Sequence, residues 1–186
     1  MKLITPTLET ERLILKRGTL EDYLKVYEYD FTRLRNIGGE FDFVKCDPEI
    51  IKTFVNYADE EDNVLDFIVY EKNGTPIGNI VADRYGDYGK SIEISINIHY
   101  ESWGKGYAKE AIIEIMKYIF NNLDIDRVIY GYAIENKKSK KVNDKIGFEP
   151  IDIKVEFYKR IKKDVTSMVT AMSKERFYEL YGEKVK

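Results

Sequence analysis

The chain is short of histidine and cysteine, and each scarcity excludes a class of chemistry. Among its 186 residues, His99 and Cys46 are the only ones of their kind. A single cysteine forms neither an intramolecular disulfide nor a thiolate metal cluster, which suits a reducing compartment. A single histidine cannot build a multi-histidine metal site, and a Ser-His-Asp triad would have to use His99. The sequence therefore predicts no bound metal.

Long apolar runs and a strong net charge are also missing. No apolar stretch approaches the roughly 18 residues that span a bilayer, and Pro6 and Glu9 make the N-terminus a poor signal peptide. The net charge is −3, which is not typical of a nucleic-acid binder. Hydrophobic residues make up 44% of the chain, enough to bury a core. We expect one domain over residues 1–186, cytoplasmic, monomeric or homodimeric, with neither membrane nor nucleic acid as partner.

The stretch from Ser91 to Ala108 combines a strand, a glycine loop and the start of a helix. Isoleucines at every second position from Ile92 to Ile98 alternate with polar residues, the period of a half-buried strand. From Trp103 the sequence reads W-G-K-G-Y-A, and a helical series of apolar residues follows. The first N–H groups of such a helix lack internal partners and carry partial positive charge. The stretch therefore predicts an anion-binding site.

The order of elements predicts a mixed α+β fold. We expect a central twisted sheet of about seven strands with helices on both faces, in which three antiparallel strands precede a helical crossover to a parallel neighbour. The expected strands lie near residues 12–17, 66–70, 77–82, 91–98, 127–134, 153–159 and 165–172. The expected helices lie near residues 19–30, 47–58, 108–121 and 136–145, with a last helical turn from Ser173. Asn73-Gly74 is a strong signal for the turn of the first hairpin.

Charge favours a polyphosphate ligand near the glycine loop. The short helix from Lys137 to Lys145 holds five lysines and one aspartate, a net charge of +4. Asn136 stands at the junction between that helix and the strand before it. Alone, a charged helix face is usually solvated, and a glycine pair usually marks a tight turn. Together, the loop, the basic helix and Asn136 suit a ligand with a pyrophosphate and a further phosphate.

Several motifs resemble the GNAT N-acetyltransferases. Trp103 to Ala108 is similar to the family's acyl-CoA pyrophosphate loop, Q/R-x-x-G-x-G/A, with Trp in place of Gln or Arg. Asn136-x-x-Ser139 with Gly147-Phe148 resembles the family's downstream N-x-x-S…G-F segment. The run from Thr10 to Leu15 resembles the T-E-R-L-x-L start of the branch that acetylates the N-termini of ribosomal proteins. The resemblance covers nearly the whole chain.

The resemblance implies a V-shaped split between the strands at 91–98 and 127–134, which receives acetyl-CoA as co-substrate. The pantetheine would run along Ile98 to Tyr100, and the amides of Gly104 to Ala108 would hold the pyrophosphate. The implied cofactor-binding residues are Ile98, His99, Tyr100, Trp103, Gly104, Lys105, Gly106, Tyr107, Ala108, Asn136, Lys138, Ser139, Lys141 and Asn143.

The implied reaction is direct transfer of an acetyl group to a primary amine. Glu93, on the polar face of the strand beside the split, is the expected base, with a surface cross-strand pair as its alternative role. Backbone N–H groups near Ile98 and His99 are the expected oxyanion donors. Many family members protonate the departing thiolate with a Tyr seven residues after the Asn, but that position is Asn143 here. Ser139 is therefore the expected acid, with a local helix hydrogen bond as its alternative role.

The sequence does not identify the acceptor. Residues 19–62 hold twelve acidic and five basic side chains, which favours a cationic acceptor: a small-molecule amine, a polyamine or a protein N-terminus. We expect its pocket to come from the first two helices, the loop at 31–46 and the last strands. A catalytically weakened acyl-CoA-binding module or sensor is the alternative, supported by Trp103 and the missing Tyr. A dinucleotide-dependent oxidoreductase is disfavoured, because Lys109 stands where G-x-G-x-x-G requires Gly.

Overall fold

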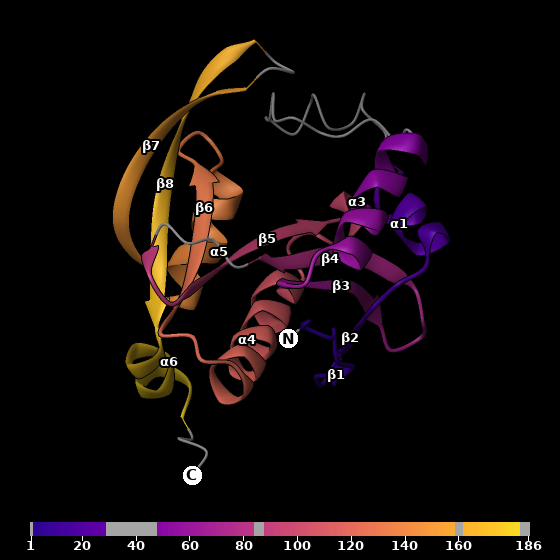
Figure 1. Cartoon of the computed structure of the whole chain (residues 1–186), viewed down its shortest axis with the longest axis horizontal. Helices are drawn as coiled ribbons and strands as arrows, with labels where there is room; N and C mark the ends of the chain where they lie inside the picture. Colours follow the sequence, from indigo (N-terminus) through magenta and orange to yellow (C-terminus); the bar gives the residue numbers. More distant parts are fainter. Residues whose placement is uncertain (1, 29–47, 84–87, 159–161, 183–186) are drawn as a thin grey trace. The chain divides into compact units, whose positions relative to one another are not determined.

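The computed structural model describes residues 2–28, 48–83, 88–158 and 162–182. Its elements are β1 (Leu8–Glu9), β2 (Leu13–Lys16), α1 (Leu20–Val26), α3 (Pro48–Glu60), β3 (Val64–Glu71), β4 (Pro76–Asp83), β5 (Ser91–Ile98), the 3-10 helix η2 (Tyr100–Ser102), α4 (Tyr107–Asn122), β6 (Arg127–Ala133), α5 (Lys137–Ile146), β7 (Glu149–Tyr158), β8 (Lys163–Ser173) and α6 (Lys174–Tyr181). Figure 1 labels the strands and the α-helices. Each expected strand and helix has a counterpart among them.

The eight strands form one mixed sheet in the order β1-β2-β3-β4-β5-β6-β8-β7. β5 and β6 are parallel, whereas β1–β2, β2–β3, β3–β4, β6–β8 and β7–β8 are antiparallel pairs. Helix α4 connects the parallel pair, as a parallel crossover requires. The expected mixed α+β class is therefore confirmed. The expected number of about seven strands omits β1, whose two residues are too few to show a period of two.

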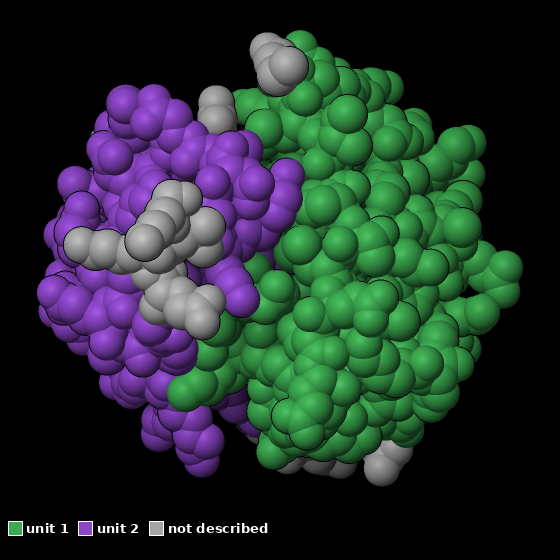
Figure 2. Space-filling model, turned by 90° about the horizontal axis from the view of Figure 1, so that it is seen from below, with its two compact units in different colours: residues 1–83, 96–114 green, residues 84–95, 115–186 purple. Residues whose placement is uncertain are grey.

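The chain divides into two compact units, which Figure 2 distinguishes by colour. The first comprises residues 1–83 and 96–114, and the second comprises residues 84–95 and 115–186. Two elements, β5 and α4, run from one unit into the other. The expectation of a single domain over the whole chain stays a prediction.

Local signals set the limits of several elements in the first unit. Thr19 caps α1 in a capping box, because its side chain accepts from Asp22 N while the Asp22 carboxylate accepts from Thr19 N. Helix α1 ends at Val26, earlier than the expected limit near Asp30, which itself lies outside the described residues. In the β3–β4 turn, Gly74 has a φ of 89°, a conformation that favours glycine.

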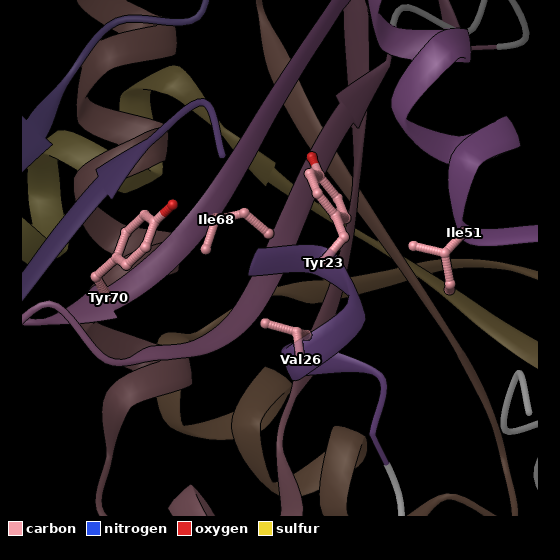
Figure 3. Close-up of a cluster of buried hydrophobic side chains, with 5 residues drawn as sticks. All are labelled: Tyr23, Val26, Ile51, Ile68 and Tyr70. Atoms are coloured by element: carbon pink, nitrogen blue, oxygen red, sulfur yellow. The ribbon is translucent and has the colours of Figure 1, made fainter. Parts of the chain in front are cut away.

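Helices α1 and α3 bury apolar side chains against β3. Tyr23 and Val26 of α1, Ile51 of α3, and Ile68 and Tyr70 of β3 form one buried cluster (Figure 3). The α1 pair is spaced three residues apart and the β3 pair two residues apart, so each pair lies on one face of its element. This cluster anchors both helices on the sheet.

A buried ionic network joins the same elements. Asp66 of β3 is 2% exposed, and its Oδ2 accepts hydrogen bonds from the Tyr23 hydroxyl and the Arg17 guanidinium. Arg17 also donates to the Val55 carbonyl at 2.8 Å and to Asp59 Oδ1 at 3.0 Å, both on α3. Burial raises the pKa of Asp66, and the hydrogen bonds from Tyr23 and Arg17 oppose that rise. Arg17 therefore links α1, α3 and β3 around one buried carboxylate.

The second unit has its own aromatic contacts. Phe120 of α4 and Phe177 of α6 have ring centroids 5.3 Å apart, and Tyr130 of β6 lies 5.7 Å from Phe148, which follows α5.

None of the helices in the described ranges is both long and apolar enough to cross a membrane. In the same part of the chain, no group of three or more His, Cys, Asp or Glu side chains is placed to hold a metal ion.

Replacing Arg17 with Met should lower the free energy of unfolding by about 3 kcal/mol, because the buried Asp66 carboxylate loses its charged partner. Urea unfolding followed by circular dichroism measures the change. Lys25→Met is the matched control: it removes an exposed cation that pairs with Glu21 one helical turn away, and it should leave the stability nearly unchanged. Equal losses in the two variants would show that Arg17 acts as an ordinary surface cation.

Candidate active site

The parallel pairing of β5 with β6 is short. The paired residues are Ser91 with Arg127, Ile92 with Val128, and Glu93 with Ile129. Both strands continue, β5 to Ile98 and β6 to Ala133, and within these described residues no further pair joins them. The end of the pairing corresponds to the expected split between the two strands.

Glu93 lies at the last of these pairs, beside Gly131 of β6. The Glu93 side chain is half-buried, and a Cβ atom placed on Gly131 would lie 3.6 Å from Glu93 Oε1. That distance is an ordinary van der Waals contact, and it places the carboxylate against Gly131 on this face of the strand. The buried residues of the same face are Ile129, Val169 and Ala171, against which the Tyr88 ring packs.

Ser139 lies on the opposite face of β6. Asn136 caps α5, because its side-chain oxygen accepts from Ser139 N at 3.0 Å. Burial raises the pKa of the Tyr130 hydroxyl, and the Ser139 side chain, which lies beside that of Tyr130, lowers it. Tyr130 directly precedes Gly131, and successive side chains of a strand point to opposite faces. The Glu93 carboxylate and the Ser139 hydroxyl therefore lie on the two sides of β6, close to where its pairing with β5 ends.

One side of α5 is tied to the sheet, and its lysines are exposed. Asn143 is 2% exposed and donates from Nδ2 to Thr170 Oγ1 at 2.6 Å, while Thr170 donates to the Tyr130 carbonyl at 2.7 Å. The Asn143 amide thus has a partner inside the protein, and its contact with a cofactor stays a prediction. Lys138 and Lys141 are exposed, and partial burial lowers the pKa of Lys138.

The glycine loop of the first unit leads into α4. Gly104 and Gly106 have φ values of 81° and 85°, in the left-handed region that favours glycine. Glu110 N donates to the Gly106 carbonyl, the first hydrogen bond of the helix, so the N–H groups before it have no partner within the helix. Gly104, Lys105 and Gly106 are all exposed. The geometry is that of an anion-binding helix start.

Two predicted contact residues are engaged in internal hydrogen bonds. Trp103 Nε1 donates to the Ile98 carbonyl at 2.6 Å, so the indole holds the loop against the end of β5. His99 N donates to the Ile77 carbonyl of β4 at 2.7 Å. The expectation that the His99 N–H is an oxyanion donor is therefore wrong, because β4 already occupies it. N–H groups alternate in direction along a strand, so the Ile98 N–H points away from β4.

The N-terminal segment clamps the first turn of α4. Glu110 Oε1 accepts from Thr10 Oγ1 at 2.5 Å and from Arg12 N at 3.0 Å, and its Oε2 accepts from Arg12 Nε at 2.7 Å. Arg12 Nη1 also donates to the Lys105 carbonyl at 2.9 Å, inside the glycine loop. Burial alone would raise the pKa of Glu110, but the hydrogen bonds from Thr10 and Arg12 outweigh burial and lower it. Sequence reasoning missed Glu110 entirely.

A pocket of about 640 Å³ lies beside the loop, within the first unit. Its lining includes three predicted cofactor contacts, His99, Tyr100 and Lys105. The other lining residues are Lys25, Glu28, Glu71, Thr75, Pro76, Ile77, Glu101 and Ser102. The volume suits part of a small-molecule ligand, and charges of both signs line it.

Each unit carries part of the predicted set. The first unit holds the residues from Ile98 to Tyr100 and from Trp103 to Ala108, and the Tyr107 hydroxyl there donates to Glu71 at 2.9 Å. The second unit holds Glu93, Asn136, Lys138, Ser139, Lys141 and Asn143. The loop at 31–46, expected to contribute to the acceptor pocket, lies outside the described residues.

Comparisons with known proteins agree with these features. The family model described as "Acetyltransferase (GNAT) domain" matches residues 12–149. YnaD of Bacillus subtilis (strain 168), an uncharacterized N-acetyltransferase, is 32% identical over 140 residues, which cover 74% of this chain and 79% of that protein.

Solved structures share the fold. A GNAT-family acetyltransferase from Bacillus anthracis is 25% identical, with a TM-score of 0.72 over 91% of this chain and 99% of that one. The ribosomal-protein-S5-alanine acetyltransferase of Vibrio fischeri is 16% identical, with a TM-score of 0.70 over 92% and 98% of the two chains. The microcin C7 self-immunity acetyltransferase MccE, solved with acetyl-CoA and AMP, is 14% identical, with a TM-score of 0.73 over 88% and 93%.

Glu110→Gln should lower the free energy of unfolding at neutral pH and change it little at acidic pH. The pKa of Glu110 is lowered in the folded protein, so its carboxylate stabilises the fold above the ordinary value of 4.5, and the contribution is lost as pH falls through the lower, folded value. We expect a difference in the free energy of unfolding of about 1 kcal/mol at pH 7 that shrinks below about pH 4. Urea unfolding of both proteins across pH measures it, and a difference independent of pH would contradict the clamp.

Proposed function

Because the chain belongs to the GNAT family of acetyltransferases, we propose that it transfers an acetyl group from acetyl-CoA directly to a primary amine. The observation that carries the proposal is the placement of Glu93 and Ser139. Their side chains lie against neighbouring residues of β6, Gly131 and Tyr130, on opposite faces, close to where the pairing with β5 stops. A base on one face and a hydroxyl donor on the other can serve two substrates that meet at the split.

We assign the phosphates of the donor to the glycine loop. Its exposed backbone at Gly104 and Gly106 and the start of α4 fit an anion, and Lys105 adds a charge beside them. Lys138 and Lys141 would add further charge as flexible groups rather than a fixed fork. MccE, which shares the fold, was solved with acetyl-CoA, and this supports acetyl-CoA as the donor.

In the proposed reaction Glu93 takes a proton from the acceptor, because an alkylammonium has a pKa of about 10 and cannot attack. The nitrogen lone pair attacks the thioester carbonyl carbon, the C–S bond breaks, and its electron pair leaves with sulfur. The Ile98 N–H, which points away from β4, is the proposed donor to the carbonyl oxygen. The nitrogen loses two protons in all, and the first passes through Glu93 to solvent. Ser139 is the proposed donor of its hydroxyl proton to the CoA sulfur, and the second proton from nitrogen restores that hydroxyl by way of solvent.

The proposed acceptor is cationic. The acidic excess of residues 19–62 would attract an ammonium group, and Glu28, Glu71 and Glu101 line the pocket of the first unit. A small-molecule amine, a polyamine and a protein N-terminus are the candidate classes, and the name of the Vibrio fischeri protein supports the last of these. The proposal places the enzyme in the cytoplasm, as a monomer or homodimer.

Release of free thiol from acetyl-CoA over a panel of those amine classes tests the proposal. We expect release with at least one class, together with acetylated product by mass spectrometry. A catalytically weakened acyl-CoA-binding module would bind CoA in calorimetry and release no thiol with any amine. If the protein bound NAD but not CoA, the result would support a dinucleotide-dependent oxidoreductase instead.

Glu93→Gln should lower kcat about 100-fold near pH 7, because an amide cannot take the proton from the acceptor. The deficit should shrink as pH rises toward about 10, where the amine is already neutral. The pH profiles of kcat for both proteins measure this. Glu175→Gln, on the exposed surface of α6, is the matched control and should retain the wild-type profile. If Glu93→Gln kept the wild-type kcat, Glu93 would not be the base, and its role would be the surface cross-strand pair.

Ser139→Ala should slow transfer about tenfold or more when the leaving thiol is weakly acidic, as in CoA, because the thiolate departs without a proton donor. An acetyl ester of an aromatic thiol should show little loss, since that thiolate leaves unassisted. The comparison of kcat/KM for the two donors measures the effect. Equal losses with both donors would assign Ser139 to its alternative role, a local helix hydrogen bond.

A further inference from the structure

We propose that Arg12 is a positioning residue that makes the start of α4 fit for a polyanion, by neutralising Glu110 and by turning the Lys105 carbonyl away from the ligand. The inference rests on the proposed function, in which the glycine loop receives the phosphates of CoA. It explains why the N-terminal T-E-R sequence, remote from the loop in the chain, lies against it in the fold.

The position of Glu110 is unfavourable for binding a polyanion at the start of α4. It occupies the first turn of α4, four residues after Gly106, so its carboxylate lies within about 6 Å of the helix start along the axis. A carboxylate at this end is favourable for the helix itself, because it faces the positive end of the macrodipole. For a bound polyanion it is unfavourable, because two like charges repel and the helix end no longer offers its full potential.

Arg12 offsets that charge with a fixed geometry. Its Nε and Nη2 both approach Glu110 Oε2, at 2.7 and 2.5 Å, so the guanidinium and the carboxylate share several contacts rather than one. Thr10 and the Arg12 backbone hold the other carboxylate oxygen. The pair is therefore better defined than a surface ion pair between two flexible chains.

The same guanidinium contacts the loop itself. Arg12 Nη1 donates to the Lys105 carbonyl at 2.9 Å, and Nη2 lies 3.5 Å from where a Cβ on Gly106 would be. The Arg12 Cζ also stands 4.8 Å from the centroid of the Tyr107 ring. With its carbonyl oxygen directed to Arg12, the peptide between the two glycines cannot present that oxygen to an anion, and the positive edge of the loop is left for the ligand.

Calorimetric titration with CoA tests the inference in four full-length proteins: wild type, Arg12→Gln, Glu110→Gln and the double variant. We expect Arg12→Gln to raise the Kd for CoA about tenfold, because an unpaired carboxylate is left at the helix start. Glu110→Gln should bind CoA at least as well as wild type. The double variant should recover to within about threefold of wild type, since the charge that Arg12 opposes is gone and only the contact with the Lys105 carbonyl is missing.

An acetyl donor without phosphates distinguishes an effect of Arg12 on phosphate binding from general damage to the structure. The acetyl thioester of N-acetylcysteamine has no phosphates, so its kcat/KM with Arg12→Gln should equal that of wild type. Lys72→Gln is the matched control: it removes a cation that pairs with Glu9 at 2.9 Å, rather than with Glu110 or the loop, and should leave the Kd unchanged. Circular dichroism verifies that each variant is folded.

The outcomes distinguish this inference from the proposed function. If wild type binds no CoA, the proposed function fails and so does what rests on it. If wild type binds CoA but Arg12→Gln binds equally well, the inference alone is overturned. It is also overturned if the double variant binds as weakly as Arg12→Gln, or if Arg12→Gln loses activity equally with the phosphate-free donor, because both results indicate a general structural role.

Discussion

The three residue pairs that join β5 to β6 are the constraint on which the rest of the site depends. Because the strands are parallel, the chain must cross over between them, and α4 with its glycine loop is that crossover. Because the pairing ends at Glu93 and Ile129, the later N–H groups of β5 that point away from β4 are not used by β6. Gly131 lies beside the Glu93 carboxylate, just past the end of this pairing.

Two helix starts are the proposed anion sites, and their charges are arranged differently. In α5 no acidic residue occupies the first turn, an asparagine caps the helix, and lysines surround it. In α4 an acidic residue, Glu110, does occupy the first turn. Arg12, which directly precedes β2, neutralises it in an ion pair. The first arrangement is local and visible in the sequence. The second needs the N-terminal segment to be folded in place, so in the proposed function phosphate binding at α4 would depend on the packing of the strands before it.

Signals carried by neighbouring residues were predictable, and contacts between distant residues were not. Alternating isoleucines predicted β5, and Asn73-Gly74 predicted the hairpin. The contacts of Glu110 with Thr10 and Arg12 span 100 and 98 residues of chain, and the T-E-R motif alone does not say which acid it meets. The His99 N–H was assigned wrongly because its direction depends on the register of β5 with β4, which no single segment reveals. The base and acid roles followed from the family resemblance and stay predictions.

Trp103 and Asn143, the two residues that depart from the family's motifs, both form hydrogen bonds within the protein. Trp103 replaces a Gln or Arg, and its indole N–H is used by the Ile98 carbonyl, which ties the loop to the end of β5. Asn143 stands in place of a Tyr, and its amide is held by Thr170 beneath α5. Both side chains therefore have a partner within the protein, and their contacts with a cofactor stay predictions. The proposed function therefore assigns the phosphate contacts to the backbone and the lysines, and the proton donor to Ser139, whose side chain lies beside Tyr130.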